Sequence, residues 1–175
     1  MLVTYEPFKD SKMIKFQDIR DKYNDIVKLQ REEREVLQSV AGLIVQNFSD
    51  SLGLEQSYWK HPSDGQTEEY VFITAMKDGE SVKAVLNELK PDEHGCLLFS
   101  VGLTVDKSPI SFPKMHVFTS LSLRREEGGF TLTVGEGMFE TTLSEKPTGA
   151  ELAPVSEAIK RSVLKCLDSY TPARH

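Results

Sequence analysis

The sequence predicts an α+β fold made of a long N-terminal helix, an antiparallel meander sheet of five or six strands and a C-terminal amphipathic helix. Apolar residues near the N-terminus recur at alternating three- and four-residue steps, the helical period. Segments between residues 70 and 143 have strand composition and are joined by glycine-containing turns. A second helical pattern covers residues 154–170. With 175 residues, of which 39% are hydrophobic, the chain is expected to form one domain, residues 1–175.

The first expected element is a helix over residues 11–52. Ser11 suits the N-cap and Gly53 the left-handed position that ends a helix, while residues 2–5 before it fit either a short edge strand or an arm. No proline interrupts the pattern. Its apolar stripe consists of Phe16, Ile19, Tyr23, Ile26, Leu37, Val40, Ile44 and Phe48.

The two halves of this helix differ in character. Apolar residues are dense from 36 to 48, as expected of a helix buried against a sheet. From 16 to 30 the stripe is narrow, and it turns polar at Gln30 and Glu33, which suits a two-helix contact or a partner's groove. A continuous helix of about 40 residues would be about 60 Å long, whereas a compact domain of this size is about 40 Å across. Either part of the helix extends beyond the domain, or a break near Arg31 folds both halves onto one sheet.

Residues 55–69 are expected to form a loop in which Trp59 covers an edge of the core or contacts a ligand or partner. A strand is expected over 70–76, followed by a type I′ hairpin turn at Asp78-Gly79. Residues 81–90 fit a strand or a helical face; the preceding turn favours the strand.

Further strands are expected over 96–105, 114–125, 130–134 and 138–143, and a loop over 145–153 leads to a last helix that Pro154 opens. The segment 114–125 alternates cleanly, so its side chains should divide between two faces. One face carries Met115, Val117, Thr119, Leu121 and Leu123; the other carries His116, Phe118, Ser120, Ser122 and Arg124.

Composition excludes several functional classes. A net charge of −6 and a pI near 5.3 argue against nucleic-acid binding, which requires a basic face. The sequence has no apolar run near 18 residues, so no membrane span is expected. The first residues lack the charged segment followed by an apolar segment that is typical of a signal peptide. This favours a cytoplasmic protein. Cys96 and Cys166 lie among apolar neighbours and are expected to be buried free thiols.

The sequence contains no recognisable catalytic or cofactor motif, so no cofactor and no metal is expected. Gly135-Glu136-Gly137 is followed by a strand pattern rather than the helix that a dinucleotide fingerprint needs. His61 and Asp64 could form an acid–base pair, and Asp92, Glu93 and His94 could hold a metal, but solvated loops explain both groups. These observations favour a non-enzymatic protein over an enzyme.

The most plausible site is one face of the strand 114–125, because alternating residues share a surface. This face carries His116, Phe118, Ser120 and Arg124, and Tyr70, Phe72 and Thr74 could join it from another strand. A mixture of aromatic, hydroxyl and arginine side chains is typical of protein interfaces. The alternative is a pocket between the sheet and the long helix, lined by Trp59, Tyr70 and Phe72 together with His116 and Phe118.

These observations favour a non-enzymatic cytoplasmic protein-binding module of chaperone, adaptor or inhibitor type. It would act through Phe16, Ile19, Tyr23 and Ile26 on the helix and through the sheet face with His116, Phe118, Ser120 and Arg124. The expected partner is another protein, with a second copy of the chain (a homodimer) as one candidate. A pocket that binds a small ligand or catalyses a reaction is the alternative. No motif identifies a family; in outline alone, the element order resembles that of bacterial secretion chaperones.

Overall fold

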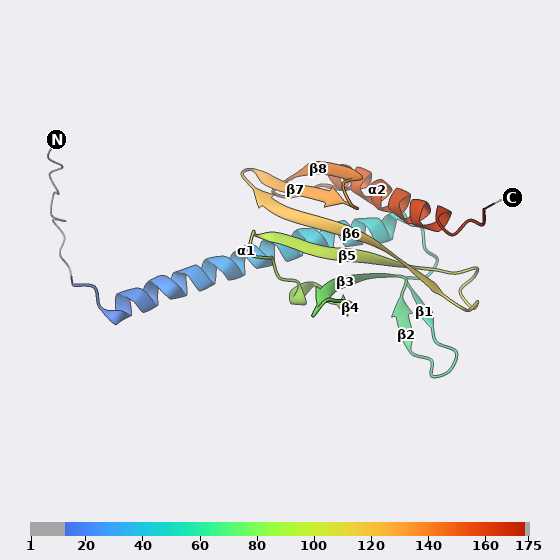
Figure 1. The fold of residues 1–175 in the computed structure, drawn as a ribbon, viewed down its shortest axis with the longest axis horizontal. Helices are drawn as coiled ribbons and strands as arrows, with labels where there is room; N and C mark the ends of the chain where they lie inside the picture. The colour runs from blue at the N-terminus through green and yellow to red at the C-terminus, as the bar shows by residue number, and fades with distance from the viewer. Residues whose placement is uncertain (1–12, 174–175) are drawn as a thin grey trace. The chain divides into compact units, whose positions relative to one another are not determined.

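A computed structural model describes residues 13–173, so the expected N-cap Ser11 and the segment 2–5 lie outside the described residues. Its elements make the predicted α+β fold (Figure 1). They are α1 (Phe16–Ser51), β1 (Tyr58–Lys60), β2 (Thr67–Glu69), β3 (Val71–Lys77), β4 (Glu80–Ala84), a 3₁₀ turn (Leu86–Glu88), β5 (Cys96–Val105), β6 (Met115–Glu126), β7 (Gly129–Val134), β8 (Phe139–Ser144) and α2 (Gly149–Asp168). The chain divides into two compact units between Glu33 and Arg34, within α1.

Helix α1 runs from Phe16 to Ser51 without interruption, so the break considered near Arg31 is absent. In the first unit, every helical residue from Phe16 to Glu32 is exposed. In the second unit, the predicted buried half is confirmed by Leu37, Val40, Ala41, Ile44 and Phe48, which are all in the core. Leu43 lies among them in the sequence but is exposed, so this half buries only one side.

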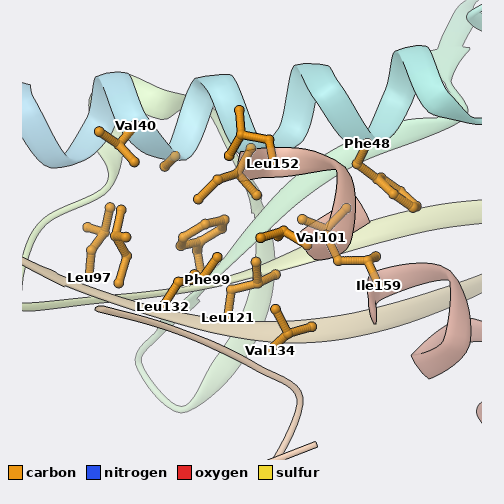
Figure 2. Packing of buried hydrophobic residues seen from close by; sticks show 14 of the residues in the cluster. Val40, Phe48, Leu97, Phe99, Val101, Leu121, Leu132, Val134, Leu152 and Ile159 are labelled. Atoms are coloured by element: carbon orange, nitrogen blue, oxygen red, sulfur yellow. The ribbon is translucent and has the colours of Figure 1, made fainter. Parts of the chain in front are cut away.

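The main sheet has six antiparallel strands in the order β4-β3-β5-β6-β7-β8. One face packs against α2 and the buried half of α1, and Figure 2 shows the side chains that meet there. Facing pairs such as Phe99 with Leu121 set the register between β5 and β6. Ser156 of α2 donates a hydrogen bond of 2.6 Å to Asn47 Oδ1, which joins the two helices over the sheet. The meander and the faces of the segment 114–125 follow the prediction.

Residues 81–90 are a strand in their first half only. Asp78 and Gly79 have φ angles of 52° and 81°, as the predicted type I′ turn requires, and β4 follows them. The chain then leaves the sheet through the 3₁₀ turn because Leu89 is buried in the core. The Leu89 carbonyl accepts a 2.7 Å hydrogen bond from Gln38 Nε2 of α1. Tertiary packing therefore overrides the strand pattern here.

Helix α2 begins at Gly149, five residues before the predicted start at Pro154, so the expected loop 145–153 is shorter than predicted. Thr148 accepts from the Glu151 backbone N–H, and the Glu151 carboxylate accepts from the Thr148 N–H, which completes a capping box. The sequence Thr148-Gly-Ala-Glu151 carries this capping-box signal, which predicts an earlier helix start than Pro154 does. Pro154 instead lies inside the helix, where only its bond to the Ala150 carbonyl is lost.

Residues 55–69 also differ from the prediction, because they contain the antiparallel hairpin β1–β2 rather than a loop alone. Neither helix in the described part of the chain is long and apolar enough to cross a bilayer. Cys96 and Cys166 are free, as predicted, but half-buried rather than buried. The Cys96 thiol lies 2.8 Å from the Ser122 hydroxyl.

Candidate functional site

The first candidate surface is the N-terminal stripe, defined as Phe16, Ile19, Tyr23 and Ile26. Their exposed fractions are 68%, 57%, 65% and 41%. Large apolar side chains seldom gather in an exposed row on a helix unless the row meets a partner. The helix is locally well formed there. Asp18 Oδ2 accepts a hydrogen bond from the Lys15 N–H, and Asp21 Oδ1 accepts one from Gln17 Nε2.

The second candidate surface is the open face of the six-stranded sheet, the face opposite the helices. The register places Phe72 of β3, Gly102 of β5 and Phe118 of β6 side by side across three strands. His116 lies two residues before Phe118, and therefore on the same face. The predicted grouping of His116, Phe118 and Phe72 is thus present on one surface.

These three rings form a cluster in which Phe72 is central. Its ring meets the rings of His116 and Phe118 edge-on, with centroids 5.5 Å and 5.9 Å apart. Gly102 makes room for this arrangement, because a Cβ added there would lie 2.4 Å from the Phe72 ring. Thr104 Oγ1 lies 3.1 Å from His116 Nδ1 and so orients the imidazole. Phe118 nevertheless remains half exposed, so the cluster is an aromatic surface rather than a core.

Ser120 and Arg124 lie further along the same face of β6. Ser120 lines a hollow of about 650 Å³ whose wall carries the hydroxyl side chains of Thr74, Ser81, Ser100, Ser120 and Ser122. Arg124 Nη2 donates to Glu126 Oε1 at 2.7 Å, and this hydrogen bond raises the pKa of the guanidinium. Ser120 therefore presents a hydroxyl at the hollow, while Arg124 is already paired within its own strand.

A buried polar network at the other end of the open face was not predicted. The Lys114 ammonium donates to Asp106 Oδ2 at 2.6 Å and to the carbonyls of Ser108 and Pro109, and the Tyr70 hydroxyl donates to the same carboxylate oxygen at 2.7 Å. The Lys114 side chain is only 3% exposed. The signal in the sequence was a lone lysine that begins a strand after a two-proline loop, which is too weak to reveal a buried ion pair.

The network shifts two pKa values in opposite directions. Burial would raise the pKa of Asp106, but hydrogen bonds from Lys114 and Tyr70 outweigh it and lower that pKa below its usual value. Burial, with the hydrogen bond to Asp106, raises the pKa of Tyr70 to about 12. Both shifts favour the charged lysine–aspartate pair beside a neutral tyrosine. The arrangement therefore holds the loop 106–114 in place rather than presenting a reactive group.

Trp59 covers this loop. Its ring is buried, packs edge-on against Phe112 at 5.9 Å, and lies 5.2 Å from Lys114 Nζ. Trp59 therefore covers the loop 106–114, whereas the sequence predicted that it covers an edge of the core. The residue belongs to β1 and not to a loop. Its Nε1 has no hydrogen-bond partner among residues 13–173.

The predicted pocket between the sheet and the long helix needs correction. His116 and Phe118 lie on the open face, opposite α2 and the buried half of α1, so they do not line a space between the sheet and α1. A groove of about 570 Å³ does lie between Val45 of α1 and the strands β3 and β4. Of the other proposed lining residues, Phe72 borders this groove, whereas Trp59 and Tyr70 do not.

The two weak catalytic hypotheses have structural explanations. Asp64 Oδ1 accepts from the Gln66 N–H, and His61 lies beside Glu68 rather than Asp64. Asp92 accepts from the backbone N–H groups of His94 and Cys96, which closes the turn before β5. Residues 13–173 contain no cluster of three His, Cys, Asp or Glu side chains arranged to hold a metal.

The chain matches no protein-family model, no curated protein and no solved structure at a significant level. A functional proposal therefore rests on the chemistry of the N-terminal stripe and the open face.

Proposed function

We propose that this chain is a non-enzymatic protein-binding module that acts through the N-terminal stripe and the open face. The observation that carries the proposal is the stripe: four large apolar side chains, each at least 41% exposed, on one side of a regular helix. A helix presenting apolar residues at steps of three and four is the form in which proteins bind a partner helix or an apolar groove. A chaperone, an adaptor or an inhibitor would use such a surface.

The open face supports the same proposal independently. Its cluster of Phe72, His116 and Phe118 offers aromatic side chains held in fixed relative positions over Gly102. Aromatic residues dominate the binding energy of protein interfaces because they bury large areas with few rotatable bonds. The hollow that Ser120 lines adds several hydroxyl groups among apolar side chains next to this cluster.

The proposal predicts that Ile19→Asp weakens binding through the stripe and leaves the fold intact. The probe is a synthetic helix of three heptads with leucine at the seam and uncharged glutamine beside it. An interface anchor is worth about 2 kcal/mol or more, so the dissociation constant should rise about 30-fold. Fluorescence anisotropy measures the binding, and circular dichroism measures the helix content.

Asn24→Asp is the matched control, because it places the same side chain on the same helix but off the stripe, and its affinity should equal that of the wild-type chain. Equal affinity of the Ile19→Asp and wild-type chains would refute the role of the stripe. Light scattering on the same samples distinguishes partners: a dimer that Ile19→Asp dissociates assigns the stripe to self-association, and a wild-type monomer assigns it to another protein.

A small-ligand site is the second candidate, favoured by the groove beside β4. Val45, Val71 and Ile73 contribute apolar lining, and the acidic residues Glu68, Glu69 and Glu88 outnumber Lys83 around it. Its volume suits a small molecule, and its charge suits an aromatic cation. Val85→Trp adds a large side chain to the lining and should abolish saturable binding of phenylguanidine; unchanged binding would contradict this candidate.

A further inference from the structure

The positions beside the N-terminal stripe carry basic side chains. At about 100° per residue, Arg20 and Lys22 each lie about 80° from the centre of the stripe, on opposite sides. Lys15, the residue just before α1, precedes Lys22 by seven residues, or about two turns. The acidic residues Asp18, Asp21 and Asp25 lie at about 120° or more, on the back of the helix. Over residues 15–25, the basic side chains therefore lie nearer the apolar stripe than the acidic ones do.

The contacts within the helix support this arrangement. The Arg20 guanidinium lies 4.8 Å from the centroid of the Phe16 ring, at the margin of the stripe. Asp18 and Asp21 are engaged by the Lys15 backbone and the Gln17 side chain. In the part of the chain that the structure describes, no ion pair involves Arg20 or Lys22. Arg20 Nη1 donates a hydrogen bond of 3.3 Å to the neutral Gln17 Oε1, so neither cation has its charge paired within this segment.

These charges disfavour a second copy of the chain as the partner. In a parallel helix pair, the residues beside the seam meet as Lys15 of one copy and Arg20 of the other. In an antiparallel pair centred on the stripe, Lys22 meets Lys22 and Arg20 meets Arg20. Like charges face one another in both arrangements, and such pairs destabilise an interface.

We propose that the N-terminal stripe is the docking surface for an amphipathic helix of another protein, with glutamate or aspartate beside its apolar seam. This inference rests on the proposed protein-binding function and names the partner's chemistry. The stripe spans ten residue steps, about 15 Å, so about three turns of partner helix cover it. Acidic residues in that helix would pair with Lys15, Arg20 and Lys22, as charged residues beside a coiled-coil seam do when they select a partner.

A membrane surface is the competing occupant, since basic residues beside an apolar helix face also suit lipid headgroups. The composition of the segment favours the protein partner. Residues 16–33 contain five acidic and four basic side chains and no tryptophan, so the segment has no net positive charge to draw it to an anionic bilayer. Gln30 and Glu33 also end the stripe after three turns.

The test compares two variants of the glutamine-flanked probe helix, one with glutamate and one with lysine beside the same leucine seam. We expect the full-length chain to bind the glutamate helix at least about tenfold more tightly than the lysine helix at low salt. The preference should fall toward unity at about 1 M salt, where screening acts over about 3 Å. Lys22→Glu should reduce the preference several-fold, whereas Lys28→Glu, the same change on the far side of the helix, should leave it unchanged.

The controls separate this inference from the proposed function. Equal binding of the glutamate and lysine helices, both lost in Ile19→Asp, would overturn the acidic-partner inference while the protein-binding function stands. Failure of all three probe helices to bind would overturn both. Tighter binding to vesicles containing phosphatidylserine than to the glutamate helix, or a wild-type dimer that Ile19→Asp dissociates, would also overturn the inference, in favour of a membrane or a second copy.

Discussion

We expect Ile44→Asp to unfold the body formed by α1 from Arg34 onward, the sheet and α2. Ile44 is 1% exposed and belongs to the core cluster beneath the sheet. The substitution removes a buried apolar side chain and leaves a carboxyl group in an apolar environment. Together these effects should cost about 5 kcal/mol or more, which is comparable to the whole stability of a typical domain. Circular dichroism and urea denaturation measure the loss.

Leu43→Asp is the matched control, because Leu43 is the adjacent residue on the same helix but is 46% exposed. We expect this variant to keep a cooperative unfolding transition and to lose less than about 1 kcal/mol. Equal loss of structure in both variants would contradict the one-sided burial of this part of α1.

The second large effect is expected from Lys114→Met. This change leaves the Asp106 carboxylate without its cation and removes the donor to the carbonyls of Ser108 and Pro109. Breaking a buried ion pair by removing one partner typically costs about 3–5 kcal/mol, because the remaining charge stays buried and unpaired. Urea denaturation should show this loss. Lys107→Met changes an exposed lysine of the same loop and should be nearly neutral.

A double-mutant cycle identifies the ion pair as the cause. Adding Asp106→Asn to Lys114→Met removes the unpaired charge and keeps an acceptor for the Tyr70 hydroxyl, so the double variant should be more stable than Lys114→Met alone. A double variant that is less stable by the full sum of the two single losses would show that the pair is not coupled.

The lowered pKa of Asp106 also sets the sign of a pH dependence. Because the folded chain favours the carboxylate, its contribution to stability is complete above the unfolded pKa, near 4, and is lost as the pH falls below that value. The stability difference between the wild-type chain and Asp106→Asn should therefore be largest near neutral pH and shrink in acid. A difference that stays constant from pH 6 to pH 3 would contradict this role for Asp106.

Local sequence determined most of the elements. The step pattern of Leu37, Val40, Ile44 and Phe48 predicts the buried helix face because a helix repeats every 3.6 residues. The alternation in residues 114–125 likewise predicts the two faces of β6, because side chains in a strand alternate. Asp78-Gly79 predicts its turn because both residues must accept positive φ. These properties need no information from distant parts of the chain.

Part of the candidate site was also contained in the sequence. The narrow N-terminal stripe and the grouping of His116 with Phe118 follow from periodicity alone. The place of Phe72 beside them depends on β3 pairing with β5 as well as with β4, and on Gly102 lying beneath its ring. Strand order arises from contacts between residues far apart in the sequence, which a local pattern does not encode.

Tertiary structure alone decided the remaining features. Leu89 leaves the strand pattern because its side chain enters the core and its carbonyl accepts from Gln38, 51 residues earlier. Lys114 is buried only because Asp106, the residue after β5, accepts from its ammonium group, and Tyr70, the residue before β3, donates to the same carboxylate. A charge enters a protein interior where its partners are assembled in three dimensions. The sequence therefore determined the local elements and the exposed stripe, while long-range packing decided the sheet order and the buried ion pair.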